Sequence, residues 1–97
     1  MPAVCRGAGR DPDIPHCSPM NRNGLSPNVI VNGIGISRQS DHNTGHLIPI
    51  AIPCPGHTAP IVAGSGTVRV NGLGCGRIGD ATCTAVAGGS SNVFAGP

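Results

Sequence analysis

The chain has 97 residues, with 16 Gly, 10 Pro, a single aromatic residue and a formal net charge of +2. This length suits one small domain, and the Gly and Pro content disfavours helices. The six basic residues are all Arg and have no aromatic stacking platform beside them, which excludes a nucleic-acid interface, and no segment approaches the ~20 apolar residues of a membrane span.

The hydrophobic core is expected to be thin, because Phe94 is the only large ring available to it. A domain of this kind needs a further source of stability besides its core, which can be disulfides, a metal or a partner subunit. Residues 1–6 lack the basic and apolar regions of a signal peptide. Five cysteines in such a chain indicate reduced thiols in a bacterial cytoplasm, and an odd count does not fit a complete disulfide framework. A bound metal is therefore the expected source of this stability.

The predicted elements are strands that recur as copies of one unit. The chain opens at 2–6 with a returning strand that has no outgoing partner. Two full hairpins follow over 26–38 and 65–77, each with alternating Val residues and an Asn-Gly turn. The chain closes at 90–96 with an outgoing strand that has no return. Head and tail together can complete a third hairpin, so we expect an all-β fold of three hairpin-like repeats with pseudo-threefold symmetry.

Side chains that can bind a metal follow the returning strands at regular spacing. An acid comes first, and a soft or borderline ligand follows it after five residues in two copies and after three in the third. The acids, interpreted as turn-capping acceptors, are Asp11, Asp41 and Asp80. A further His precedes the second full hairpin. The predicted ligands are His16, His46, His57 and Cys83. Three imidazoles and one thiolate suit a closed, tetrahedral Zn²⁺ site, and iron is a possible substitute.

Two other side chains are alternatives as ligands. His42 lies next to Asp41 and can take the place of His46, although it breaks the five-residue spacing. Cys54 forms a Cys-x-x-His pair with His57, a spacing that can chelate.

The remaining cysteines and the arginines of the returning strands are interpreted as structural. Cys5 and Cys75 lie in strands and are expected to be small buried hydrophobic residues. Cys17 directly follows His16, and neighbours in an extended chain point in opposite directions. Surface or inter-hairpin hydrogen bonds are expected for Arg6, Arg38 and Arg77.

The repeated runs resemble those of the PAAR-repeat proteins. Ser-x-x-Val-x-Val-Asn-Gly occurs at 26–33 and 65–72, Arg-Ile-Gly-Asp at 77–80, and Ser-Ser-Asn-Val-Phe-Ala-Gly at 90–96. The Pro-Ala-Ala-Arg motif that names the family is altered to Pro-Ala-Val-Cys-Arg at 2–6.

The resemblance implies the fold, the metal site and the partner of this chain. Residues 1–97 would form a single PAAR-like domain without an effector extension, a small cone with its metal site near the apex. The family's zinc site of three histidines and one cysteine carries over to His16, His46, His57 and Cys83. The partner would be the trimeric β-helical spike of a contractile injection system, capped by one tip monomer per trimer, with apolar residues such as Ile30 and Phe94 exposed on its base.

The implied function is structural: a membrane-piercing tip that is assembled in the bacterial cytoplasm, contacts the target cell envelope transiently, and ends up in a virion or outside the cell. Both a phage tail baseplate and a type VI secretion system fit these features, and we favour the phage tail. The chain is not expected to be an enzyme, because four protein ligands leave no open position on the metal. The alternative is a free-standing zinc-binding or redox module, which would need a thiol with an acidic pKa.

Overall fold

The protein, described by a computed structural model over residues 1–47 and 55–97, consists of short strands joined by loops, and no helix occurs in this part of the chain. Six strands form three two-stranded antiparallel sheets: β1 (Ile30–Val31) with β2 (Ile34–Gly35), β3 (His46–Leu47) with β4 (Gly56–His57), and β5 (Arg69–Val70) with β6 (Leu73–Gly74). The all-β prediction is confirmed. Over the described residues, no helix is long and apolar enough to cross a membrane.

Both predicted hairpins are present, at the Asn-Gly dipeptides. Asn32 and Gly33 have φ angles of 54° and 78°, and Asn71 and Gly72 have φ angles of 53° and 79°. These consecutive positive φ values are those of a type I′ turn, whose twist matches the twist of the flanking strands. Asn and Gly tolerate this backbone region better than other residues, which explains why the two turns form where they do.

The alternation within the outgoing strands is also confirmed in part. Val31 and Val70 are 8% and 4% exposed, whereas Ile30 is 55% exposed. The expectation that each returning strand continues beside its own outgoing strand to Arg38 or Arg77 is wrong. The regular strand register ends at Gly35 and Gly74, and the last hydrogen bonds within each hairpin are made by Ile36 and Cys75, whose N–H groups donate to the Val29 and Val68 carbonyls.

From Ile36 and Cys75 onwards, the returning segments also pair with one another. Single antiparallel backbone pairs join Val4 to Arg77, Arg6 to Ile36, and Arg38 to Cys75. At the centre, Ser37 N–H donates to the Cys5 carbonyl (3.0 Å), Cys5 N–H donates to the Gly76 carbonyl (3.0 Å), and Gly76 N–H donates to the Ser37 carbonyl (2.9 Å). We call these three residues the central ring. The segments leave their own hairpins because the ring satisfies their backbone groups.

The first and last segments pair as predicted. Ala3 forms an antiparallel pair with Phe94, and the Val4 N–H donates to the Val93 carbonyl at 3.0 Å. The opening segment also belongs to the central ring through Cys5, so the two ends of the chain are tied to the same structure as the hairpins.

The core is small, as the composition predicts. One apolar cluster contains Val4, Val31, Ile36, Val70, Cys75 and Ala95, and a second contains Cys5, Ile61 and Val86. Neither cluster contains a large ring, and Phe94 is 51% exposed.

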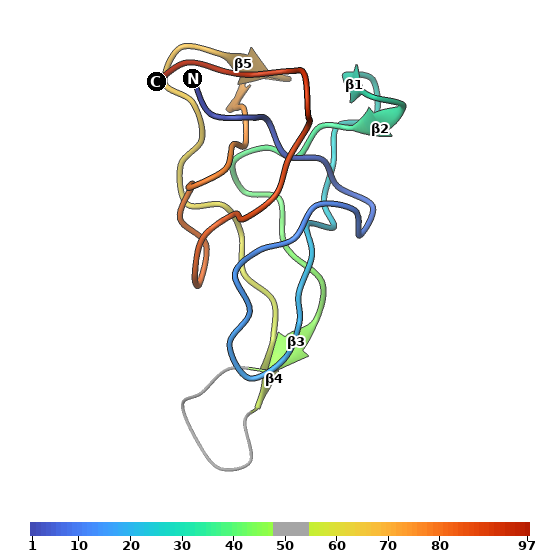
Figure 1. Ribbon diagram of the computed structural model, residues 1–97, viewed down its shortest axis with the longest axis vertical. Coiled ribbons are helices and arrows are strands. Elements are labelled where there is room, and N and C mark those ends of the chain that lie inside the picture. Colours follow the sequence, from blue (N-terminus) through green and yellow to red (C-terminus); the bar gives the residue numbers. More distant parts are fainter. Residues whose placement is uncertain (48–54) are drawn as a thin grey trace.

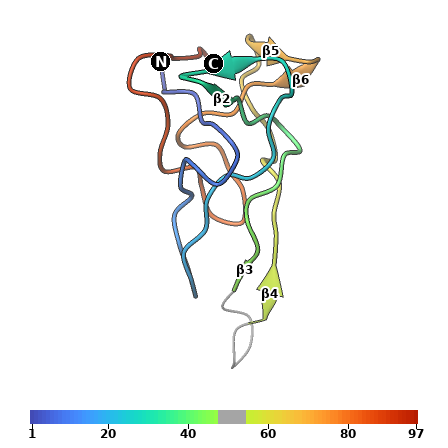
Figure 2. The ribbon, with the colours of Figure 1, turned by 90° about the vertical axis from the view of Figure 1, so that its right-hand side faces the viewer.

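The molecule is elongated, with extents of 39 × 24 × 22 Å. Figure 1 shows β1, β2 and β5 at one end of the long axis together with both termini, and β3 and β4 towards the other end. Figure 2 shows the same separation from the side, with β6 beside β5. The loops that connect the two ends are paired by isolated contacts such as Pro12 with Asn21 and Arg22 with Asn43.

Candidate metal centre

The four ligands predicted from the sequence come together at one place. The side-chain donor atoms of His16, His46, His57 and Cys83 all lie within 4.8 Å of one another, and the group could hold a metal ion. Two of the histidines come from the β3–β4 sheet, in which His46 pairs directly with His57. The other two ligands come from loops near the beginning and the end of the chain.

The distances within the cluster fit a tetrahedral ion. Cys83 Sγ lies 3.3 Å from His46 Nε2 and 3.6 Å from His16 Nε2. A tetrahedral Zn²⁺ with ordinary Zn–S and Zn–N bonds holds its sulfur and nitrogen ligands about 3.5 Å apart. The three imidazole rings approach one another closely, with centroid separations from 4.3 to 6.0 Å. The donor set and its spacing therefore suit a thiophilic divalent cation.

His46 is held in the tautomer that a metal needs. Its ring is buried, and Nδ1 lies 2.9 Å from the Thr44 carbonyl oxygen. Because a carbonyl only accepts hydrogen bonds, Nδ1 carries the proton and the Nε2 lone pair faces Cys83. This is the usual outer partner of a metal-binding histidine.

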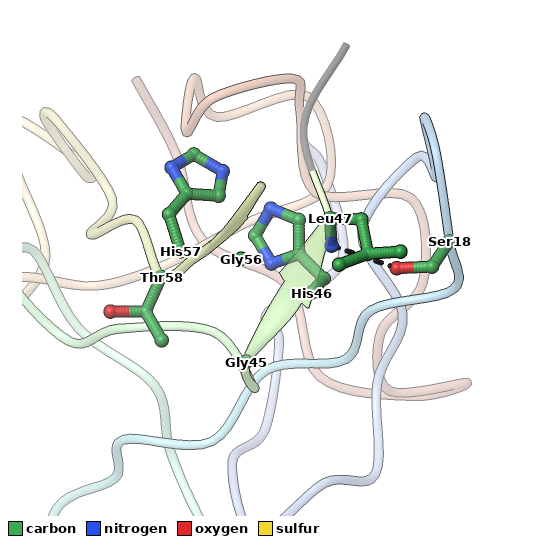
Figure 3. Close-up of a pocket in the computed structure, with 7 residues that line it drawn as sticks. All are labelled: Ser18, Gly45, His46, Leu47, Gly56, His57 and Thr58. Atoms are coloured by element: carbon green, nitrogen blue, oxygen red, sulfur yellow. Dashed lines mark hydrogen bonds between the residues drawn. The ribbon is translucent and has the colours of Figure 1, made fainter. Parts of the chain in front are cut away.

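The loop that carries His16 is fastened to β3 next to His46. The Leu47 N–H donates to Ser18 Oγ at 2.9 Å, the dashed contact in Figure 3. Figure 3 also shows His46 and His57 projecting from adjacent strands beside an open pocket. The β3–β4 pairing and the Ser18 contact together bring three imidazoles to one end of the molecule.

His57 contributes a buried ring nitrogen that suits a metal ligand. Its Nε2 atom is buried and makes no hydrogen bond with any described residue. Desolvation, together with the neighbouring His46 and His16 rings, lowers the pKa of His57 below its usual 6.5. A neutral imidazole with an unshared lone pair is the form that binds a metal.

The alternative ligands are only partly described by the structure. His42 is exposed, and its Nδ1 atom lies 2.9 Å from Thr58 Oγ1, so it does not belong to the cluster. Cys54 lies outside the described residues.

Cys5 and Cys75 lack the environment of reactive thiols. Cys5 and Cys75 are fully buried, as predicted, and burial raises the pKa of Cys5 to about 12 and that of Cys75 to about 11. A thiol-based redox module needs a shift in the opposite direction. The expectation that all five cysteines are reduced is wrong for Cys17, which is disulfide-bonded.

The acids of the repeats are acceptors, as expected, but their main donors are the arginines of the returning strands. In each copy one carboxylate accepts the backbone N–H of an Arg and also binds its guanidinium. The shortest charged contacts are 2.8, 2.9 and 2.8 Å, in the pairs Arg6–Asp11, Arg38–Asp41 and Arg77–Asp80. These clamps fix the turn that leads from each returning strand towards the cluster.

A buried polar chain behind the cluster has no counterpart in the sequence predictions. Arg22 Nη1 binds Asp13 Oδ2 at 2.8 Å, and Asn43 Nδ2 donates to the same oxygen at 3.0 Å. Asn43 in turn approaches Met20 and Cys83. These residues fall outside the repeat, so no periodicity marks them. The only local signal is that Arg22 and Asp13 carry charges in loops rich in Gly and Pro, where charged residues are normally solvated.

No protein-family model and no curated protein matches the sequence.

Proposed function

We propose that this protein is a PAAR-like spike tip, which caps the trimeric β-helical spike of a contractile injection system and pierces the target envelope. The observation that carries the proposal is the central ring, in which each of three segments donates one hydrogen bond and accepts one (Cys5, Ser37 and Gly76). Each segment also ends in an Arg–Asp clamp of the same design. Such recurrence supports a pseudo-threefold arrangement within one chain, which would match the symmetry of a trimeric partner.

The end of the molecule that holds the two Asn-Gly hairpins and both termini, here called the wide end, exposes apolar side chains that suit docking to a partner. Ile30 is 55% exposed and Phe94 is 51% exposed, and both lie in segments at the end that also holds the termini and the full hairpins. Exposed apolar side chains of this size at one end of a small protein suit burial against a partner. The spike would cover them, with one tip monomer on each trimer.

The metal has a mechanical role in this proposal. The ligands His16, His46, His57 and Cys83 come from segments spread over most of the sequence, so one Zn²⁺ ion would hold the narrow end together. Iron could take its place in the same donor set. The metal supplies crosslinking, and no catalytic step is assigned to it.

Elemental analysis of the purified protein tests the metal. We expect one equivalent of zinc or iron in the wild type and in the control His42→Ala, whose ring lies outside the cluster. His57→Ala and Cys83→Ala should lose the metal and should melt at a lower temperature. No stoichiometric metal in the wild type would contradict the clamp.

Docking tests the partner. A trimeric β-helical spike protein mixed with the wild-type chain should sediment as one chain per trimer. Ile30→Asp and Phe94→Asp should weaken this complex by at least about tenfold, because each buries a charge in the contact. Val62→Asp is the control, since Val62 is 64% exposed and its backbone binds Ala81, outside the hairpins.

The two experiments separate the spike tip from its alternative. A chain that holds its metal but binds no trimeric spike would be a free-standing zinc-binding module. A spike complex with three chains per trimer would contradict the internal symmetry match.

A further inference from the structure

We propose that Asn43 and Met20 are positioning residues that control the charge on the Cys83 thiolate at the candidate metal centre. The inference depends on the metal assigned under the proposed function, and it concerns atoms outside the four ligands. Asn43 is 1% exposed and Met20 is 2% exposed, so both form the buried side of the cluster.

Two contacts fix the orientation of the Asn43 amide. Its Oδ1 atom accepts the Ala59 N–H at 2.8 Å, and Nδ2 donates one hydrogen to Asp13 Oδ2 at 3.0 Å. The opposite orientation of the amide would place NH₂ against an N–H and a carbonyl oxygen against a carboxylate. The orientation is therefore set by its partners.

The buried ion pair holds Asp13 in place for this contact. Asp13 Oδ2 also accepts a hydrogen bond from Arg22 Nη1 at 2.8 Å, and both side chains of that pair are 0% exposed. A carboxylate that is fixed on one side by a guanidinium cannot turn away from Asn43 without breaking a buried charge pair. The amide is consequently anchored at two points.

The second hydrogen of Nδ2 faces two sulfur atoms. Met20 Sδ lies 3.2 Å from Nδ2, Cys83 Sγ lies 3.9 Å from it, and the two sulfurs are 3.9 Å apart. One N–H is thus shared between a thioether and the only sulfur ligand of the cluster. Because Met20 Sδ lies closer to Nδ2 than Cys83 Sγ does, Met20 weakens the hydrogen bond that Cys83 can accept.

A hydrogen bond to a ligand sulfur withdraws charge from it, which changes the metal–sulfur bond. The two residues therefore have opposing effects on the charge of the Cys83 sulfur: Asn43 donates a hydrogen bond that stabilises the thiolate, and Met20 competes for the same hydrogen. Removal of Asn43 and removal of Met20 should therefore change the metal–sulfur bond in opposite directions. A residue that only fills space would not do so.

The test uses Co²⁺ in place of the native metal, because its sulfur-to-metal charge-transfer band reports the energy of the thiolate electrons. Met20→Leu keeps the volume and removes the competing acceptor, so the band should move to higher energy. Asn43→Leu removes the donor, so the band should move to lower energy, and Co²⁺ affinity measured against a chelator should fall by about 10- to 100-fold. Asn23→Leu is the control, since Asn23 is exposed.

Each result of the test has a distinct meaning. Bands that stay unshifted in both variants, or that shift in the same direction, overturn the inference while the metal stands. If Asn43→Leu does not fold, Met20→Leu decides alone, and an unshifted band or a shift to lower energy overturns the proposal. A wild-type protein that binds no Co²⁺ refutes the proposed metal and this inference with it.

Discussion

Arg22 and Asp13 form a fully enclosed ion pair: Arg22 Nη1 lies 2.8 Å from Asp13 Oδ2, and both side chains are 0% exposed. The guanidinium also donates to Ser37 Oγ at 3.4 Å and to the carbonyl oxygen of Asp41. Ser37 belongs to the central ring and Asp13 contacts Asn43 behind the metal cluster. The pair therefore connects the hairpin end of the molecule with the end that carries the histidines.

Replacing Arg22 should destabilise the protein strongly. Arg22→Met leaves the Asp13 carboxylate buried without its cation, which typically costs about 3–5 kcal/mol. Urea unfolding followed by circular dichroism measures the loss. Arg69→Met is the control, because Arg69 is exposed, and it should change stability by less than about 0.5 kcal/mol. Equal effects of the two substitutions would contradict the structural role of the pair.

The buried thiols should make the protein sensitive to alkali. Burial raises the pKa of Cys5 from 9.0 to about 12 and that of Cys75 from 9.0 to about 11. The unfolded chain loses these protons near pH 9 while the folded chain keeps them. The stabilisation is therefore complete below pH 9 and falls as the pH rises towards the folded values, by up to about 1.4 kcal/mol per pH unit for each thiol. Denaturant unfolding between pH 8 and pH 11 should show this decline.

Cys5→Ala isolates the contribution of one thiol. The variant should be less stable at pH 8, because it loses buried volume, but its stability should fall less steeply with pH than that of the wild type. Parallel curves for the two proteins would show that Cys5 ionises equally in the folded and unfolded chains.

Gly76 should not tolerate any side chain. A Cβ at this position would lie 2.7 Å from Cys5 Sγ, 2.7 Å from the Ser37 carbonyl oxygen and 2.8 Å from Ile61 Cδ1. Gly76→Ala must push the central ring apart, and we expect a loss of about 1–3 kcal/mol in thermal or urea unfolding. Gly66→Ala is the matched control, since the nearest atom to its Cβ is 3.6 Å away. A Gly76→Ala variant as stable as that control would refute the close packing of the ring.

The features that the sequence predicts correctly are those with a local signal or a repeat. The Asn32-Gly33 and Asn71-Gly72 turns form because both residues accept positive φ, which depends on the dipeptide alone. The grouping of the candidate ligands had a partial signal of this kind, because His16 and His46 share a five-residue spacing from the preceding acid, which distinguishes His46 from His42.

The features that could not be predicted depend on contacts between distant segments. The pairing of His46 with His57 lies outside the repeated hairpin units, so the repeat does not predict it. Arg22 would be solvated in an isolated loop, and only the folded chain brings Asp13, Ser37 and Asp41 around it. The pairing between the returning segments depends on three segments meeting at once, which a two-strand hairpin pattern cannot show.

The central ring also determines when the chain can fold. Cys5 lies near the start of the chain, yet its N–H donates to the carbonyl of Gly76, and the N–H of Val4 donates to the carbonyl of Val93. During synthesis the first segment can pair with residues 35–37 once these are made, but the N–H groups of Val4 and Cys5 have no native acceptor until residues 93 and 76 have left the ribosome. Contacts between residues so far apart in sequence cost loop entropy before they give any stabilisation, so folding should be slow for a domain of this size.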